Sequence, residues 1–229
     1  MKTREVLLPL LQPVVGRAAG IARRPTIVSE RIVKTPVKGV SVAMNQLHDD
    51  LKALRKAADA ELRLRWDRNL PFAELLFDRW ERAQELGFGE GTSVYDSAHI
   101  FGNVTVGKRT WIGPFVILDG LGADLTIGNF CDISTGVHIF THDTALRCVS
   151  MGEAPVRQFP VSIDDGTYIG SQSVVVAGTS IGSQCIIGAN SVVNSDIPDR
   201  TIVAGSPAVP IGYVEGEGAE VRCVFSADC

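Results

Sequence analysis

Two of the four histidines in the chain, His138 and His142, lie where the segment 140–162 begins. This segment lacks the regular aliphatic pattern of the sequence on either side of it. A neutral imidazole accepts a proton from a hydroxyl group at about pH 7, and it also binds metal ions. Asp143 follows His142 directly, but neighbouring side chains often point apart. A backbone carbonyl or another carboxylate is therefore an equal candidate for orienting the imidazole.

The sequence on both sides of this segment has a period of six residues. Such a period is neither that of a helix nor that of a strand, so each unit is expected to form one short strand and a turn. Glycine often follows the aliphatic residue, and a small or β-branched residue stands four positions after it, which favours a turn with little side-chain bulk. Three strands per coil, stacked in parallel, predict a prism with an aliphatic core. The aliphatic positions are Val94, Ile100, Val106, Ile112, Leu118, Ile127, Ile133, Ile139, Ile163, Ile169, Val175, Ile181, Ile187 and Val193.

The repeat is interrupted at two places. Three extra residues between Leu118 and Ile127 predict a small bulge on one face. The larger interruption separates Ile139 from Ile163, and residues 140–162 are expected to form a loop. An aliphatic core does not require such an excursion, and long loops on a rigid scaffold usually carry function.

The runs that start at Ile169, Ile181 and Ile187, and the closing sequence 196–208, resemble the hexapeptide-repeat acyltransferases, in particular the maltose, galactoside and nodulation-sugar O-acetyltransferase branch. The similarity covers about residues 91–212. It implies an all-β solenoid, a left-handed parallel β-helix, with an N-terminal helical segment. The left hand comes from the resemblance alone, because general connection rules favour right-handed crossovers. The resemblance also implies acetyl-CoA as the acyl donor, a homotrimer, and a small-molecule or glycan acceptor.

In the resembled enzymes a histidine at the start of the loop is the catalytic base, and His142 matches that position best. Direct transfer to a sugar hydroxyl is then expected, with backbone N–H groups stabilising the oxyanion. Sugar-acetylating relatives have an acidic residue that holds the acceptor hydroxyls, and Asp119 stands close to the corresponding position in this sequence. Further acceptor-side candidates in the loop are Arg147, Glu153 and Arg157.

The resemblance also implies a coenzyme site. Ser171 and Ala189 match a serine and a small residue that border the pantetheine arm, and Asn194 and Ser195 stand where relatives commonly have Thr-Lys. Val209 and Pro210 stand where relatives carry an arginine. Two cations that would meet the coenzyme phosphates are thus absent. Either Arg200 or the basic N-terminal segment replaces them, or the affinity for the coenzyme is weaker.

Three alternatives are open at this stage. Related prisms N-acetylate a nucleotide-linked amino sugar, a reaction that depends less on a base. The hexads could instead form a non-catalytic trimeric scaffold. The γ-type carbonic anhydrases share this coil and bind zinc between subunits with three histidines. Here His99 and His138 occupy equivalent positions two coils apart, but the spacing of His138 and His142 is one residue tighter than in that family, and no metal is expected.

Four segments are predicted: a basic arm (1–40), a helical cap (41–90), the β-helix acyltransferase domain (91–212, with loop 140–162) and a C-terminal tail (213–229). The arm holds eight Lys/Arg and two Glu, whereas residues 91–229 hold six Lys/Arg and fourteen Asp/Glu. Such an arm is usually solvated or intersubunit, and it also suits peripheral contact with an anionic membrane. The net charge of −4 gives no indication of a nucleic-acid partner.

The cap is expected to contain a helix at about 41–66, with an apolar stripe formed by Leu47, Leu51, Leu54, Ala58 and Leu62, and a second helix at about 70–86 with Asn69 as its N-cap. An uncapped solenoid end would expose apolar core, so these helices are expected to cover the first coil or to pack on a neighbouring subunit. The five cysteines include no Cys-x-x-Cys pair, and this pattern indicates a reducing, cytoplasmic location.

Overall fold

The computed structural model describes residues 42–226, with side chains from Met44 onward. The chain divides into two units, Met1–Leu47 and His48–Cys229. The boundary falls within helix α1 (Val42–Trp66), and every other element described below belongs to the second unit. The predicted basic arm, residues 1–40, lies outside the described residues.

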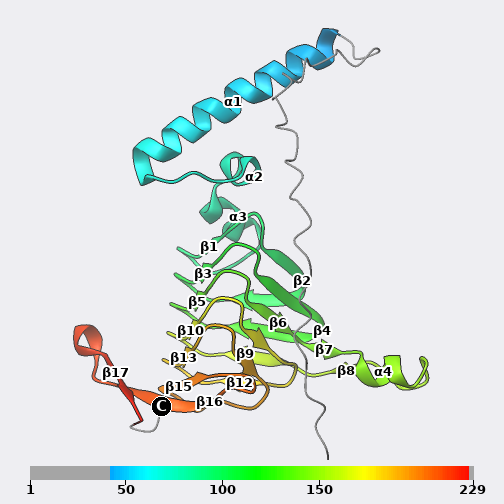
Figure 1. The fold of residues 1–229 in the computed structure, drawn as a ribbon, viewed down its shortest axis with the longest axis vertical. Coiled ribbons are helices and arrows are strands. Elements are labelled where there is room, and N and C mark those ends of the chain that lie inside the picture. The colour runs from blue at the N-terminus through cyan, green and yellow to red at the C-terminus, as the bar shows by residue number, and fades with distance from the viewer. Residues whose placement is uncertain (1–41, 227–229) are drawn as a thin grey trace, which may run out of the picture. The chain divides into compact units, whose positions relative to one another are not determined.

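The repeats form a parallel β-helix with three faces (Figure 1). The first face contains β1 (Ser93–Val94), β3 (Trp111–Ile112), β5 (Asp132–Ile133), β10 (Tyr168–Ile169), β13 (Ile186–Ile187) and β15 (Thr201–Ala204). The second contains the first halves of β2 (His99–Val106) and β4 (Ile117–Ile127), followed by β6 (His138–Phe140), β11 (Val174–Val175) and β14 (Val192–Val193). The third contains the second halves of β2 and β4, followed by β9 (Val161–Ile163) and β12 (Ser180–Ile181).

Three corners join these faces and recur in each coil. The first corner joins the first face to the second, and the third corner joins the third face back to the first. The second corner, between the second and third faces, is crossed without a break by β2 and β4. In the next coil the chain leaves the prism at this corner and returns at β9. The predicted parallel β-helix is confirmed, and the predicted excursion occurs where the repeat is interrupted.

The inward positions are those that the six-residue period predicts. Except for Ile100, which is partly buried, each predicted aliphatic residue is at most 3% exposed. The small residues that follow are also buried, and their hydroxyl groups link successive coils. The Oγ1 atom of Thr110, for example, donates to Gly128 O at 2.9 Å and accepts from Cys131 N at 3.1 Å. These hydroxyls therefore enter the core without the cost of an unpaired polar group.

The helical segment differs from the prediction after residue 66. Two short helices, α2 (Phe72–Leu76) and α3 (Arg79–Glu85), replace the single helix expected at 70–86. Phe77 is extended, and the side chain of Asp78 caps α3 by accepting from Trp80 N and Glu81 N. Asn69 is not an N-cap, because its side chain donates to Asp59 Oδ1 at 3.1 Å. A better capping residue inside the expected helix thus divides it.

The cap contacts the first coil through α3 and the chain around it. Ala83 and Phe88 join the hydrophobic core of the prism. The guanidinium group of Arg82 donates to Tyr95 O and, at 2.9 Å, to Ala98 O. By contrast, three leucines of the α1 stripe are exposed in the described chain, with Leu47 at 56%, Leu51 at 42% and Leu54 at 49%, while Leu62 is partly buried.

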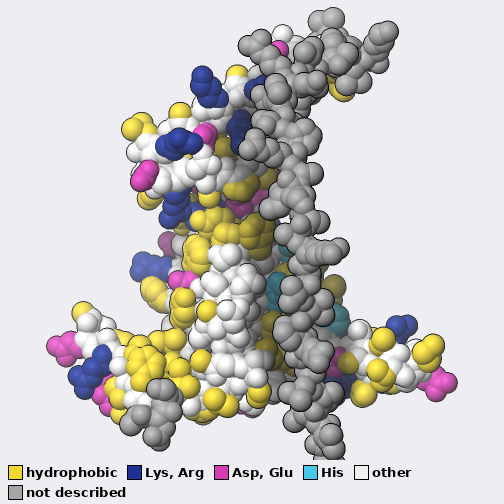
Figure 2. Space-filling model, in the orientation of Figure 1, with side chains coloured by type: hydrophobic (Ala, Val, Ile, Leu, Met, Phe, Trp, Pro, Cys, Tyr) yellow, Lys and Arg dark blue, Asp and Glu magenta, His cyan; other side chains and the backbone are white. Residues whose placement is uncertain are grey.

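The C-terminal part extends the first face. β16 (Val209–Glu215) pairs antiparallel with β15, and β17 (Arg222–Phe225) pairs antiparallel with β16 after the short 3₁₀ helix η1 (Gly218–Glu220). The boundary expected at residue 212 therefore lies inside a strand. In Figure 2 the charged side chains gather over the helices, the C-terminal strands and the excursion, while the visible side of the coils is mostly uncharged. Within residues 42–226, no helix is both long enough and apolar enough to span a bilayer.

Candidate active site

The excursion from the second corner forms an arm, defined here as residues 141–160. It contains β7 (His142–Asp143), α4 (Ala145–Val149) and β8 (Arg157–Gln158), and β7 and β8 pair antiparallel. His142 lies opposite Gln158 and Asp143 opposite Arg157. Residues directly opposite each other share one side of a sheet, and successive residues alternate between sides. His142 and Gln158 therefore lie on one side of the arm, and Asp143 and Arg157 lie on the other.

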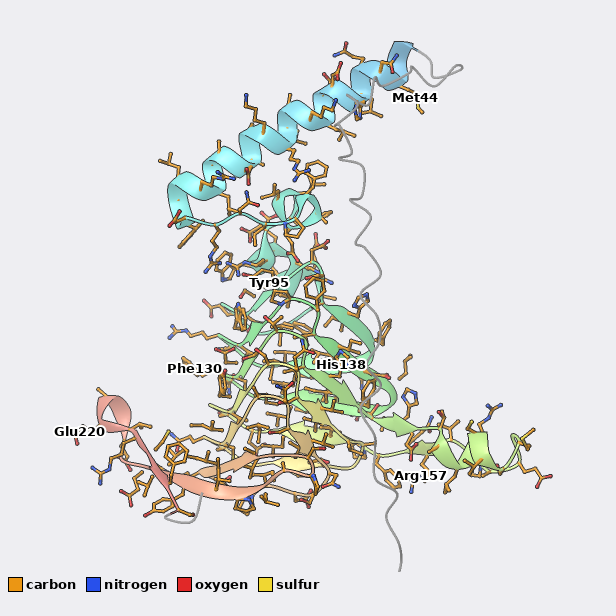
Figure 3. All side chains as sticks on the ribbon, in the orientation of Figure 1. Met44, Tyr95, Phe130, His138, Arg157 and Glu220 are labelled. Atoms are coloured by element: carbon orange, nitrogen blue, oxygen red, sulfur yellow. The ribbon has the colours of Figure 1, made fainter. Side chains whose placement is uncertain are left out.

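The carboxylate of Asp143 accepts hydrogen bonds from Arg157 and Ala145. Its Oδ2 accepts from Arg157 Nε at 3.1 Å, and its Oδ1 accepts from Ala145 N at 2.7 Å. The hydrogen bond from Arg157, and then that from Ala145, hold the pKa of Asp143 below its usual value. Asp143 does not orient His142, and Arg157, labelled on the arm in Figure 3, is turned away from it.

The three extra residues of β4 hold the root of the arm. Gly102 pairs with Gly120 and Val104 with Leu125, so residues 121–124, called here the β4 insertion, face a single residue of β2. Within the insertion, Gly122 N and Ala123 N donate to Thr141 Oγ1 at 3.3 and 3.2 Å. Thr141 in turn donates from its Oγ1 to Asp119 O at 2.8 Å and is fully buried. The predicted bulge is therefore present, and it fixes the residue that precedes His142.

Gly122 is the point of closest approach between the insertion and the arm. A Cβ atom at this position would lie 2.6 Å from His142 Cβ and 2.8 Å from Thr141 O. Ordinary contacts between carbon atoms are about 3.5–4.0 Å. Only glycine allows His142 to occupy its present place.

The side chain of Asp119 lies against the imidazole of His142. The distance from His142 Nδ1 to Asp119 Oδ2 is 3.1 Å, and the two side chains are 30% and 8% exposed. The N–H direction departs from the carboxylate, so the contact lacks the alignment of a hydrogen bond, and Nδ1 has no other partner in the described chain. Oδ1 of the same carboxylate accepts from Leu121 N at 3.0 Å.

This arrangement suits proton transfer. A carboxylate at Nδ1 favours the tautomer that carries its proton there, which leaves Nε2 free to accept one. A pocket of about 200 Å³ adjoins the ring and is lined by Leu121, Gly122, His142, Val156 and Gln158. Larger cavities of about 470 Å³ beside α3 and about 460 Å³ at the third corner have no histidine in their walls.

The residues expected at the coenzyme lie at two different corners. Ser171 and Ala189 follow β10 and β13 at the first corner, one coil apart, and Asn190 N donates to Ser171 O at 3.0 Å. Ala189 is exposed. Asn194 and Ser195 follow β14 at the second corner, the corner of His142. The second face thus separates Ser171 and Ala189 from His142 within one chain.

Arg200 lies apart from the other residues expected at the coenzyme site. It lies at the third corner, where its Nε donates to Val214 O at 3.1 Å and its Nη2 donates to Gly216 O. The sequence contains no Lys or Arg between residues 171 and 199. This stretch of the chain therefore has no cationic side chain to offer a coenzyme phosphate.

His99 and His138 occupy equivalent positions on the second face, as the period predicts. Both pair with Ile117, which lies between them, so their backbones are about 10 Å apart at the usual strand spacing. Within residues 42–226 of a single chain, no three His, Cys, Asp or Glu side chains are placed to hold a metal ion. The zinc alternative needs histidines from neighbouring chains, and it stays a hypothesis.

Comparison with known proteins identifies the repeat. The family model for bacterial transferase hexapeptides, with six repeats, matches residues 160–195. A Schizosaccharomyces pombe protein provisionally named an acetyltransferase is 36% identical over 95 residues, which is 42% of this chain and 46% of that protein. The protein CapG of Staphylococcus aureus is 34% identical over 105 residues, 45% of this chain and 60% of that protein. The chain thus spans about half the length of the curated relatives it matches.

Two solved structures are similar to the chain. A variant of the Bacillus cereus N-acyltransferase AntD, solved with dTDP-4-amino-4,6-dideoxyglucose and coenzyme A, has a TM-score of 0.50 at 19% identity over 57% of this chain and 86% of that one. A hexapeptide-repeat acetyltransferase of Vibrio cholerae, solved with acetyl coenzyme A, has a TM-score of 0.46 at 23% identity over 78% of this chain and 92% of that one. Residues 160–195 thus match the model for bacterial transferase hexapeptides, and they lie within the parallel β-helix.

Proposed function

We propose that the chain is an acetyl-CoA-dependent O-acetyltransferase that acts on a sugar, a sugar nucleotide or a glycan precursor. The observation that carries the proposal is the buried carboxylate of Asp119 at 3.1 Å from His142 Nδ1, at the mouth of a pocket. The match to transferase hexapeptides and the similarity to the S. pombe protein support the reaction class. Asp119 then orients the base, a role that differs from the acceptor-holding role expected for it.

The reaction is a direct transfer. The acceptor hydroxyl gives its proton to His142 Nε2 while its oxygen forms a bond to the thioester carbonyl carbon. The carbon–sulfur bond then breaks, and the proton passes from His142 to the departing thiolate of coenzyme A. No acyl-enzyme is required, and the thiol nearest to His142 in the sequence, that of Cys148, is exposed and lies outside the walls of the pocket.

The coenzyme site is proposed to lie between subunits of a homotrimer. Ser171 and Ala189 can border the same coenzyme as His142 only if the first corner of one chain adjoins the second corner of another. Asn194 and Ser195 then lie beside His142 on the second chain. Sedimentation equilibrium should give three times the chain mass of 24.6 kDa, and a monomer at micromolar concentration would contradict an intersubunit site. The free thiols of Cys131, Cys148, Cys185 and Cys223 suit a reducing, cytoplasmic location.

Release of coenzyme A from acetyl-CoA, measured with a panel of sugars and amino sugars, tests the proposal. His142→Ala should lower turnover by roughly 10²–10⁴-fold, as expected for the loss of a general base. Asp119→Asn should lower it by about 10²-fold because the ring loses its orientation. Both variants should keep the affinity for coenzyme A.

His48→Ala is the matched control, since His48 is an exposed histidine of α1. It should retain wild-type turnover. An acetyltransferase that keeps its activity in His142→Ala within a few-fold would favour N-acetylation, in which the acceptor amine needs less help from a base. Release of coenzyme A that no acceptor stimulates would contradict the acetyltransferase assignment.

A further inference from the structure

Two buried side-chain atoms lack a hydrogen-bond partner in the described chain, and both belong to the same coil. They are Nδ1 of His142, just beyond the second corner, and Oδ1 of Asp132, in β5 before the first corner. Buried polar atoms nearly always have a partner, so each exception requires an explanation. For His142 the explanation is the adjacent carboxylate of Asp119. For Asp132 no side chain of the described residues supplies a donor to Oδ1.

Asp132 lies on the outer surface of the first face. Ile133 is fully buried, and successive residues of a strand alternate between sides, so the carboxylate points outward. Trp111 and Tyr168 pair with Asp132 from the strands on either side. The residue is partly buried, and burial raises the pKa of its carboxyl group. Rotation about χ2, which is soft in aspartate, can turn either oxygen toward a ligand that brings a donor.

The indole of Trp111 leans toward the first corner. A Cβ atom at Gly113 would lie 2.9 Å from Trp111 Cη2, so the ring covers the residue at which the chain begins to turn. The surface beside the first corner therefore combines an aromatic ring with the carboxylate of Asp132. Such a surface suits a sugar ring, because the indole packs against C–H groups and the carboxylate accepts from hydroxyls.

The proposed trimer brings this surface to the base of an adjacent chain. Closed three-fold symmetry rotates one chain onto the next without shifting it along the axis. With that axis along the prism, each coil faces the same coil of the next chain. Asp132 and His142 belong to one coil and flank the two corners that the proposed trimer places together. Asp132 of one chain therefore lies at the level of His142 of the next.

The expected coenzyme residues lie in later coils of the same groove. Ser171 follows β10, one coil after Asp132, and Ala189 follows β13, one coil further on. If these two residues border the pantetheine arm, the thioester end lies at the coil of His142. The acceptor must then approach from the side of Asp132 and Trp111.

From this arrangement we infer that Asp132 of one chain binds hydroxyl groups of the acceptor that His142 of the adjacent chain deprotonates. The inference rests on the proposed acetyl transfer and on its trimer. An ionised carboxylate accepts hydrogen bonds from neighbouring hydroxyls and repels an anionic group. The site therefore favours a neutral sugar ring over a uronic acid or a sugar phosphate, and it is incomplete without a second copy of the chain.

Asp132→Asn tests the contact with the acceptor, for which the sugar that most stimulates release of coenzyme A is used. The variant should lower kcat/KM for this sugar by about 10–100-fold, as expected for hydrogen bonds to a charged group, and keep the affinity for coenzyme A. Its melting temperature should stay the same or rise, because a desolvated charge is removed. Asp164→Asn is the matched control, since Asp164 is an exposed aspartate of the third corner. It should keep the wild-type kcat/KM. A wild-type kcat/KM in Asp132→Asn, or a marked fall in its melting temperature, would overturn the inference and leave the acetyltransferase proposal intact.

Mixed trimers test whether the two residues come from different chains. Chains with Asp132→Asn and chains with His142→Ala, carrying different tags, are co-expressed, and trimers that hold both tags are isolated. One of the three sites in each such trimer then has both wild-type residues. At a sugar concentration well below KM, about a third of the wild-type turnover should return.

Mixed trimers of Asp119→Asn and His142→Ala are the control for this experiment. Asp119 and His142 lie 3.1 Å apart within one chain, so mixing restores no site and turnover should stay low. The same lack of recovery with Asp132→Asn and His142→Ala would overturn the inference. A His142→Ala protein that keeps its activity within a few-fold would instead contradict the proposed function on which the inference rests.

Discussion

Gly122→Ala should slow the proposed acetyl transfer about 100-fold, although glycine itself has no functional group. The added Cβ would lie 2.6 Å from His142 Cβ, whereas carbon atoms in contact are about 3.5–4.0 Å apart. The β4 insertion and the arm must therefore separate by about 1 Å. A misplacement of about 1 Å at a reacting group can cost about 10²-fold in rate.

The loss should appear in turnover and leave coenzyme binding unchanged, because Ser171 and Ala189 lie at another corner. Overpacking typically costs about 1–3 kcal/mol of stability, so a thermal melt is needed to show that the variant is folded. Turnover is then measured by the release of coenzyme A at saturating acetyl-CoA.

Gly152→Ala is the control, since a Cβ at that arm position meets no atom within 4 Å, although its φ of +95° adds some backbone strain. It should stay within a few-fold of wild-type turnover. A folded Gly122→Ala protein with wild-type turnover would refute the reasoning, because His142 would then be either free to move or unimportant.

Three further predictions follow from the packing of the coils. Ala189→Trp should abolish coenzyme binding without changing the thermal melt, because Ala189 is exposed at the first corner; a large drop in melting temperature would indicate a core position instead. Cys131 and Cys185 should resist iodoacetamide at pH 8 while the exposed cysteines react, since burial raises the pKa of both thiols; rapid labelling of either one in the native protein, mapped by mass spectrometry, would be inconsistent with the coil. Hydrogen bonds from the backbone and side chain of Asn129 hold the pKa of Asp165 below its usual value, so the carboxylate stabilises the fold above about pH 4 and loses this effect as the pH falls through the lowered pKa. Asp165→Asn should therefore lower the melting temperature at pH 7 by about 2–4 °C and by less at pH 3, and an equal effect at both pH values would rule out the carboxylate as the cause.

The coil could be predicted from the sequence because its pattern is local and repeated. Ile163, Ile169 and Val175 each stand at the same place in a six-residue unit, and each packs inward in the same way. The buried cysteines follow from the same rule, since Cys131 and Cys185 fill positions that take small residues. Because every six-residue unit predicts the same strand and turn, the units together predict one fold.

The site could be predicted only in part. His142 stands out because the repeat stops beside it, and the β4 insertion stands out as three extra residues. The contact between the insertion and the arm could not be predicted from the sequence. The hydrogen bonds from the insertion to Thr141 join residues 18–19 positions apart, through irregular backbone. The roles of Gly122 and Asp119 depend on that contact, which no period describes.

The start of the second helix was predicted wrongly because a residue further along the chain is also a good N-cap. Asn69 is of a residue type that often caps helices, but Asp78 caps α3, which begins later in the chain. The side chain of Asn69 donates a hydrogen bond to Asp59 instead. Arg200 is the nearest cation in the sequence to the expected coenzyme residues. The antiparallel return of β16 places Val214 O within hydrogen-bond distance of Arg200 Nε, at a different corner from those residues.

The chemical nature of the product tests the central claim most directly. The protein is incubated with acetyl-CoA labelled with ¹³C at the carbonyl carbon and with the sugar that most stimulates coenzyme A release, and the labelled product is examined by NMR before and after hydroxylamine. We expect a sugar acetate ester that hydroxylamine cleaves, formed at least about 100-fold more slowly by His142→Ala. A hydroxylamine-stable amide, or an ester formed at the same rate by His142→Ala, would contradict it.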